Sequence, residues 1–138
     1  MSGLTRRHFG LLLGASASSL ALPTYLRAQE KPRVVVIGGG PGGATVAKYV
    51  ARDSAGAIDV TLINETETFT TCFFSNLYLG DFQSFDDITH DYDKLVSNYG
   101  IKKITGRAAS VDREAKTVTL ADGSTVPYDR LVLAPGID

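Results

Sequence analysis

Residues 33–44 read Arg-Val-Val-Val-Ile-Gly-Gly-Gly-Pro-Gly-Gly-Ala, and this stretch decides the fold. Its first half is a β-branched apolar run, which is typical of a short parallel strand that is buried on both faces. Its second half places Gly38, Gly40 and Gly43 at the three positions of the G-x-G-x-x-G fingerprint. The stretch therefore predicts a buried strand, a tight turn and the start of a helix.

The fingerprint gives each of its glycines a role in binding a dinucleotide. The first permits the turn, the second lets the pyrophosphate approach the backbone, and the third lets the helix contact the strand. The phosphates are expected at the N-terminus of the following helix, beside Pro41 and Gly42. A helix with small and branched residues over 44–51 and a second strand over 58–63 complete the unit. This context favours a ligand site over a glycine-rich turn without a ligand.

The end of the second strand carries the candidate contact to the ribose. An acidic residue there normally accepts hydrogen bonds from the ribose hydroxyls. In this chain Asn64 and Glu65 share that position. Strand alternation places Asn64 on the face of Val60 and Leu62, so we favour Asn64 and keep Glu65 as the alternative. An amide oxygen accepts such a bond but lacks the charge that strengthens it.

The remainder of the chain favours FAD over a nicotinamide cofactor. A nicotinamide-binding domain would continue through short connections to another helix and a third parallel strand. Instead, residues 65–86 form a long segment of the kind that serves a ligand or an interface. We then expect a helix over 91–99 that ends at Gly100, a β-meander with a hairpin over 117–127, and a buried strand that ends at residues 134–136.

This order of elements predicts an α/β fold. We expect a Rossmann-like FAD-binding domain over residues 29–138, in which a parallel sheet carries helices and a β-meander. The domain is expected to be incomplete, as the N-terminal part of a longer flavoprotein, and to be preceded by a signal peptide.

The first residues predict export from the cytoplasm. Arg6 and Arg7 precede an apolar run over 11–22 and then Ala28, which together indicate a twin-arginine signal peptide over residues 1–28. Because the run is short and diluted by glycine and serine, we do not expect a stable membrane anchor. Ordinary solvated arginines on an N-terminal helix are the weaker alternative. The prediction is a periplasmic protein.

Charge and composition restrict the partners. The chain has 14 basic and 15 acidic side chains and a net charge of −1, which does not favour nucleic acid as a partner. One cysteine and two histidines at unrelated positions do not predict a metal site.

Cys72 is the only cysteine of the chain. In an exported chain a single thiol cannot form an internal disulfide, so it is an inert buried group, an intermolecular partner or a residue retained for its reactivity. From the residues alone, a small buried hydrophobe beside Phe73 and Phe74 is the commoner case.

Five motifs together carry a family resemblance. The chain resembles the flavoprotein subunit of flavocytochrome c sulfide dehydrogenase, within the wider family of flavin disulfide reductases and sulfide:quinone oxidoreductases. The motifs are residues 35–45, residues 60–63, Thr71-Cys72 followed by Ser75-Asn76, Ile88-x-His90-x-Tyr92-Asp93, and residues 128–130 leading to Ala134-Pro135-Gly136. The cysteine with Ser-Asn is the part specific to the subfamily.

The resemblance implies roles for residues outside the fingerprint. Cys72 would carry a thioether to the 8α-methyl group of FAD, and Ser75 and Asn76 would lie near the flavin. The backbone around Ala108 would meet the adenine ring, and the turn formed by Ala134, Pro135 and Gly136 would lie near the pyrophosphate.

The resemblance also implies a reaction. Sulfide would be oxidised, and electrons would pass through FAD to a c-type cytochrome subunit. The pair of redox-active cysteines that handles sulfur in that family is not in this sequence, so no catalytic residue is expected within the chain. A sulfide:quinone or NAD(P)H-dependent flavin oxidoreductase, and a non-catalytic dinucleotide-binding remnant, are the alternatives.

Overall fold

Four parallel strands form the sheet on which the fold is built. In a computed structural model, which describes residues 30–136, their order is β5 (Lys102–Thr105), β2 (Asp59–Asn64), β1 (Arg33–Ile37) and β9 (Arg130–Leu133). All three neighbouring pairs are parallel. The prediction of a Rossmann-like parallel sheet is therefore confirmed, whereas the predicted signal peptide lies outside the described residues.

The central position of β1 explains its uniformly apolar sequence. Val34, Val35 and Val36 are at most 8% exposed, because layers cover both faces of the strand. Successive side chains point to opposite faces, so Val34 and Val36 join one core cluster and Val35 joins the other. The predicted buried strand is confirmed.

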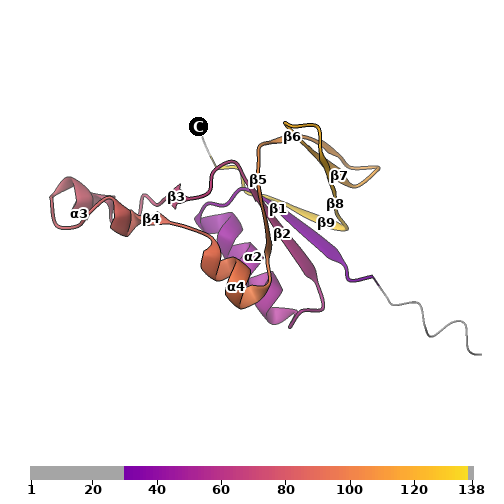
Figure 1. Cartoon of the computed structure of the whole chain (residues 1–138), viewed down its shortest axis with the longest axis horizontal. Coiled ribbons are helices and arrows are strands. Elements are labelled where there is room, and N and C mark those ends of the chain that lie inside the picture. Colours follow the sequence, from indigo (N-terminus) through magenta and orange to yellow (C-terminus); the bar gives the residue numbers. More distant parts are fainter. Residues whose placement is uncertain (1–29, 137–138) are drawn as a thin grey trace, which may run out of the picture. The chain divides into compact units, whose positions relative to one another are not determined.

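Two helices cover one face of the sheet (Figure 1). α2 (Pro41–Asp53) follows the glycine turn and buries Ala47 and Ala51 against the sheet, and α4 (Asp93–Tyr99) packs beside it. Small residues on α2 let the helix lie close to the strands. None of the helices within residues 30–136 is long and apolar enough to cross a bilayer.

A three-stranded antiparallel meander covers the opposite face. It consists of β6 (Ala108–Asp112), β7 (Thr117–Leu120) and β8 (Thr125–Pro127). Val118 and Leu120 of β7 pack against Val35 and Ile63 of the parallel sheet. The predicted meander and its hairpin are confirmed.

The long segment after β2 contains short regular elements that the sequence did not predict. They are β3 (Phe69–Thr70), α3 (Ser75–Leu79), the 3-10 helix η1 (Asp86–Ile88) and β4 (Thr89–His90). β3 and β4 pair antiparallel, and so close the base of a protruding arm that is visible in Figure 1. The arm bears exposed apolar side chains, including Phe73, Phe74, Leu79 and Phe82.

Two predicted elements differ from the structure. α4 begins at Asp93 rather than at residue 91, because the Asp91 carboxylate accepts a hydrogen bond from the Asp93 backbone N–H at 3.0 Å and forms a turn before the helix. The prediction of a buried last strand is wrong, since no residue of β9 is buried and Leu133 is 64% exposed. Within the described residues β9 has β1 as its only strand neighbour and lies at the sheet edge.

A paired charge ties the start of β9 to the start of β1. The Asp129 carboxylate accepts hydrogen bonds from the Arg33 backbone N–H at 2.7 Å and from the Arg33 guanidinium at 3.2 Å. The Asp129 backbone N–H donates in turn to the Arg33 carbonyl at 2.8 Å. The side-chain and backbone hydrogen bonds from Arg33 lower the pKa of Asp129 to about 2.

Replacing Asp129 should therefore change how stability depends on pH. With a folded-state pKa below the unfolded value, the carboxylate stabilises the fold above about pH 4, and this contribution is lost as the pH falls through about 2. Asp129→Asn should unfold at a lower urea concentration at neutral pH, and its free energy of unfolding should fall less steeply as the pH is lowered. Asp81→Asn, at an exposed position outside the sheet, is the control. A fall in the free energy of unfolding of Asp129→Asn as steep as that of the parent protein would contradict the prediction.

Candidate functional site

The glycine turn between β1 and α2 is shaped by direct backbone contacts. Gly38 has φ +101°, in the region that favours glycine. A Cβ on Gly38 would lie 1.9 Å from the Ala134 carbonyl oxygen, so the turn 134–136 rests against it. A Cβ on Gly43 would lie 1.8 Å from the Gly38 carbonyl oxygen, which explains the close contact of helix and strand.

Gly40 differs from these two glycines because the protein itself leaves its position open. No described atom lies within 4 Å of a Cβ built on Gly40, and the same holds for Gly42. Gly40 is the N-cap of α2 and Pro41 is its first residue, and within the described part of the chain no side chain caps this end. Backbone N–H groups at such an end attract anions. The open space at Gly40 therefore fits a phosphate group.

A pocket of about 250 Å³ lies at the carboxyl ends of β1 and β2, where open α/β sheets bind ligands. It brings together predicted site residues from four distant parts of the sequence. Its lining consists of Ile37, Gly38, Ile63, Asn64, Glu65, Gly106, Arg107, Ala108 and Pro135. Within this lining, Glu65 and Arg107 supply charges of opposite sign.

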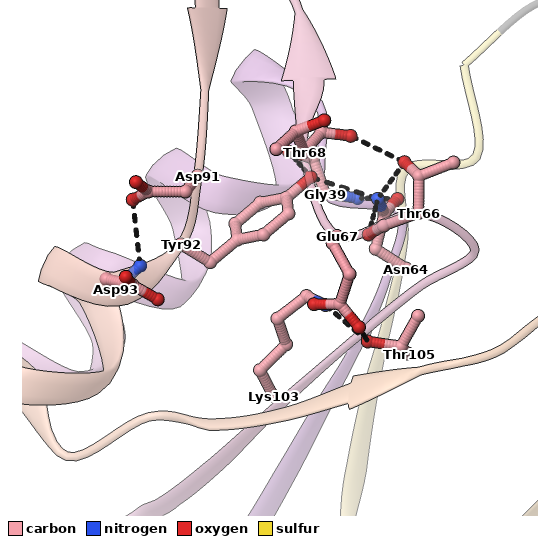
Figure 2. Close-up of polar contacts among 10 residues, drawn as sticks. All are labelled: Gly39, Asn64, Thr66, Glu67, Thr68, Asp91, Tyr92, Asp93, Lys103 and Thr105. Atoms are coloured by element: carbon pink, nitrogen blue, oxygen red, sulfur yellow. Dashed lines mark hydrogen bonds and ion pairs between the residues drawn. The ribbon is translucent and has the colours of Figure 1, made fainter.

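Asn64, the favoured ribose partner, is engaged within the protein (Figure 2). Its Oδ1 accepts a hydrogen bond from the Gly39 backbone N–H at 2.9 Å. Its Nδ2 donates to the Tyr92 hydroxyl and to the Thr66 carbonyl, both at 3.0 Å. Glu65 is exposed at the pocket and makes no hydrogen bond through its side chain to another described residue. The carboxylate of Glu65 is thus the freer acceptor of the two.

The loop that follows Glu65 is held by a partly buried ion pair. The Lys103 Nζ, on a side chain that is 10% exposed, lies 2.6 Å from the Glu67 Oε2. Thr105 donates a hydrogen bond from its Oγ1 to the Glu67 Oε1 at 2.5 Å. These hydrogen bonds, led by that of Lys103, lower the pKa of Glu67. They fix the loop that leads from the pocket to the arm.

Cys72, Ser75 and Asn76 lie on the arm and do not line the pocket. Cys72 is a free and exposed thiol, so the interpretation as a buried hydrophobe is wrong. The neighbouring Phe74, at φ 64°, is also exposed and occupies the left-handed region, which is unfavourable for a bulky residue. No cluster of metal-binding side chains occurs within residues 30–136.

Three residues of the site had no role in the sequence analysis. Gly39 lies between two fingerprint glycines, and a Cβ there would lie 2.3 Å from the Tyr92 hydroxyl oxygen. Tyr92 was noted only as part of a motif, because its contacts reach across 53 residues of sequence. Arg107 could have been found, since it is the second residue after β5, at the carboxyl edge of the sheet.

The family model described as pyridine nucleotide-disulphide oxidoreductase matches residues 32–138. The chain is 54% identical over 44 residues to the sulfide dehydrogenase (flavocytochrome c) flavoprotein chain of Chlorobaculum thiosulfatiphilum, which covers 32% of this chain and 90% of that sequence.

Longer matches occur with two quinone-linked enzymes. The chain is 38% identical over 104 residues to the sulfide-quinone reductase of Aquifex aeolicus (75% of this chain, 24% of the relative). It is 29% identical over 110 residues to a type II NADH:quinone oxidoreductase of Staphylococcus epidermidis (79% of this chain, 27% of the relative). The chain thus spans about a quarter of the length of these two relatives.

A solved structure supports the same likeness. The sulfide:quinone oxidoreductase of Aquifex aeolicus superposes with a TM-score of 0.68 at 35% identity, over 78% of this chain and 25% of that structure.

Two alanine substitutions should separate folding from binding in the glycine turn. Gly38→Ala should lower the free energy of unfolding by about 2 kcal/mol or more, because the new Cβ collides with the Ala134 carbonyl. Gly40→Ala should cost less than about 1 kcal/mol, since its Cβ meets no protein atom, yet it should weaken the binding of ADP. Urea unfolding and calorimetric titration measure the two effects. Equal losses of stability in the two variants would contradict this assignment.

Proposed function

The chain belongs to the pyridine nucleotide-disulphide oxidoreductase family, and from this premise we propose that it is the FAD-binding part of a sulfide dehydrogenase that passes electrons to a c-type cytochrome subunit. The observation that carries the proposal is its 54% identity to the flavoprotein chain of such an enzyme. Its likeness to sulfide-quinone reductase favours the same substrate, sulfide.

The described residues fit the adenosine and pyrophosphate parts of FAD. The open position at Gly40 and the uncapped end of α2 would hold the pyrophosphate, with the turn at residues 134–136 beside it. Glu65 would accept the ribose hydroxyls, as the acidic residue at this strand end does in dinucleotide-binding folds. The backbone near Ala108 would border the adenine ring.

When bound, FAD accepts two electrons from a donor and can release them singly to a haem. The part that this chain's residues take is binding and orientation. Its one cysteine cannot supply the pair that handles sulfur in the family it resembles, so no residue of this chain is assigned to the sulfur chemistry.

We assign Cys72 the role of a covalent tether to FAD. Its exposed thiol is accessible to a cofactor, as a nucleophile must be. In the net reaction the S–H bond and one C–H bond of the 8α-methyl group break, and a C–S bond forms. Dioxygen accepts the two electrons and two protons that are released, and becomes hydrogen peroxide. Ser75 and Asn76, on the same arm, would contact the flavin.

We also propose that residues 1–28 direct the folded protein to the periplasm without a lasting membrane anchor. Arg6 and Arg7 before the apolar run support this proposal. A tether through Cys72 would keep FAD bound after export.

A quinone is the second candidate acceptor. The match to sulfide-quinone reductase extends over 75% of the chain, more than twice the share matched by the flavocytochrome relative. The type II NADH:quinone oxidoreductase adds NADH as an alternative donor.

Reduction assays on the protein as its gene encodes it should separate these candidates. Anaerobic sulfide should bleach the visible absorbance of the bound flavin, and cytochrome c should restore it at least roughly tenfold faster than a soluble quinone, a difference of about 1.4 kcal/mol in barrier height. Faster oxidation by the quinone would instead identify a sulfide:quinone enzyme. Bleaching by NADH but not by sulfide would exclude both, and a protein without flavin would indicate a non-catalytic binding module.

Replacing Cys72 should release the flavin from the denatured chain. The flavin of the parent protein should migrate with the polypeptide after denaturation, and intact mass should show one added FAD. With Cys72→Ser the flavin should separate, because a hydroxyl is a far weaker nucleophile than a thiolate. Phe73→Leu, an exposed neighbour in the same turn, is the matched control and should retain the flavin. Flavin lost equally from the parent and from Cys72→Ser would refute the tether.

A further inference from the structure

A closed ring of hydrogen bonds joins Gly39, Asn64 and Tyr92 (Figure 2). The Gly39 N–H donates to the Asn64 Oδ1 at 2.9 Å, the Asn64 Nδ2 donates to the Tyr92 hydroxyl at 3.0 Å, and the Tyr92 hydroxyl donates to the Gly39 carbonyl at 3.0 Å. Tyr92 is 2% exposed, and Gly39 is also buried. The ring thus binds both backbone polar groups of one residue, Gly39, inside the phosphate-binding turn.

Only one arrangement of donors satisfies this ring. The Gly39 carbonyl can only accept, so the Tyr92 hydroxyl must give it its single proton. The hydroxyl is then left as an acceptor, which requires the NH₂ end of Asn64 to face it. The Asn64 oxygen consequently faces the Gly39 N–H. The hydroxyl of Tyr92 and the carbonyl of Thr66, which also accepts from the Asn64 Nδ2, therefore require the same orientation of the Asn64 amide.

The same pattern of donors and acceptors explains why residue 64 is an amide rather than the usual acid. A carboxylate is acceptor-only and could not donate to Tyr92. The hydroxyl would then turn toward the carboxylate and leave the buried Gly39 carbonyl unpaired, which is costly. Gly39 cannot be replaced by a residue with a side chain either, because a Cβ at this position would lie 2.3 Å from the Tyr92 hydroxyl and 2.8 Å from the Asn64 Cγ.

We propose that Tyr92 is a positioning residue for dinucleotide binding, which uses its hydroxyl and Asn64 to hold the glycine turn in its binding conformation before the ligand arrives. This inference rests on the proposed binding of FAD and adds a residue to that site. It gives the amide of Asn64 a structural role in place of the ribose contact.

Neighbouring side chains hold the aromatic ring of Tyr92 in place. The Phe69 ring lies 6.0 Å away between centroids, and the Lys103 Nζ lies 5.2 Å from the centre of the Tyr92 ring. Lys103 is itself held by Glu67 in the loop after the pocket. Burial raises the pKa of Tyr92, so the phenol retains the proton that the ring of hydrogen bonds requires. Strand β3, the loop after β2 and strand β5 thus all contribute to fixing one hydroxyl.

Loss of the hydroxyl should reduce affinity by lowering the fraction of molecules with a competent turn. The apparent Kd equals the intrinsic Kd divided by that fraction. A turn that is competent for roughly 10–20% of the time would bind about five- to tenfold more weakly.

The test compares two buried tyrosines in the full chain, in a Cys72→Ser background in which no tether can form. Tyr92→Phe should raise the Kd for ADP and for FAD roughly five- to tenfold. Tyr128→Phe is the matched control, because Tyr128 is 6% exposed and its hydroxyl bonds the Asp112 carbonyl at 3.3 Å outside the site. Both variants should lose thermal stability, but only Tyr92→Phe should change the Kd.

Asn64→Asp gives an independent measurement with an isosteric side chain. It should weaken the binding of ADP and FAD to a similar degree. The double variant with Tyr92→Phe should bind no worse than either single variant, because both substitutions break the same ring of hydrogen bonds. If Tyr92→Phe does not fold, the Kd of Asn64→Asp decides the question.

The outcomes separate this inference from the function on which it rests. A background protein that binds neither ADP nor FAD would refute both. A background protein that binds them while folded Tyr92→Phe or Asn64→Asp binds equally well would refute only the role of Tyr92. Losses that multiply in the double variant would also refute it.

Discussion

The contact between backbones at Gly38 is the constraint on which the rest of the structure depends. At this residue the end of β1, the start of α2 and the turn after β9 meet with no room for a side chain, as the 1.9 Å and 1.8 Å positions of hypothetical Cβ atoms show. Because these segments are this close, the carboxyl ends of the strands and Pro135 can border one small volume. Packing of the fold and formation of the site are therefore the same event.

Sequence patterns predicted the parts of this structure that depend on local chemistry. The β-branched run of β1, the fingerprint glycines and the hairpin of the meander each have a short-range physical cause, and each was found where expected. The ring around Gly39 could not be predicted, because its three members are separated by 25 to 53 residues and depend on tertiary packing. The burial of β9 was overestimated because an apolar sequence does not show how many neighbours a strand has.

The site consists of two parts with different construction. The pocket near Glu65 and Arg107 is built on strand ends and braced by buried hydrogen bonds, which suits recognition of a fixed group such as an adenosine. Cys72 lies on an arm that a two-residue strand pair closes at its base and that exposes much of its apolar surface. An element with so few buried contacts opens more easily than the core, which would suit the tether proposed for Cys72.

The pairing of β1 with β9 also determines when this fold can form. Arg33 and Asp129 are 96 residues apart, so a ribosome working at 5–20 residues per second needs roughly 5–20 s to supply the partner of β1. During that time one edge of a strongly apolar strand stays unpaired, and such edges invite association between chains. Long-range parallel pairing is also slow to form. Shielding of the nascent strand β1 until β9 has been synthesised would limit this association.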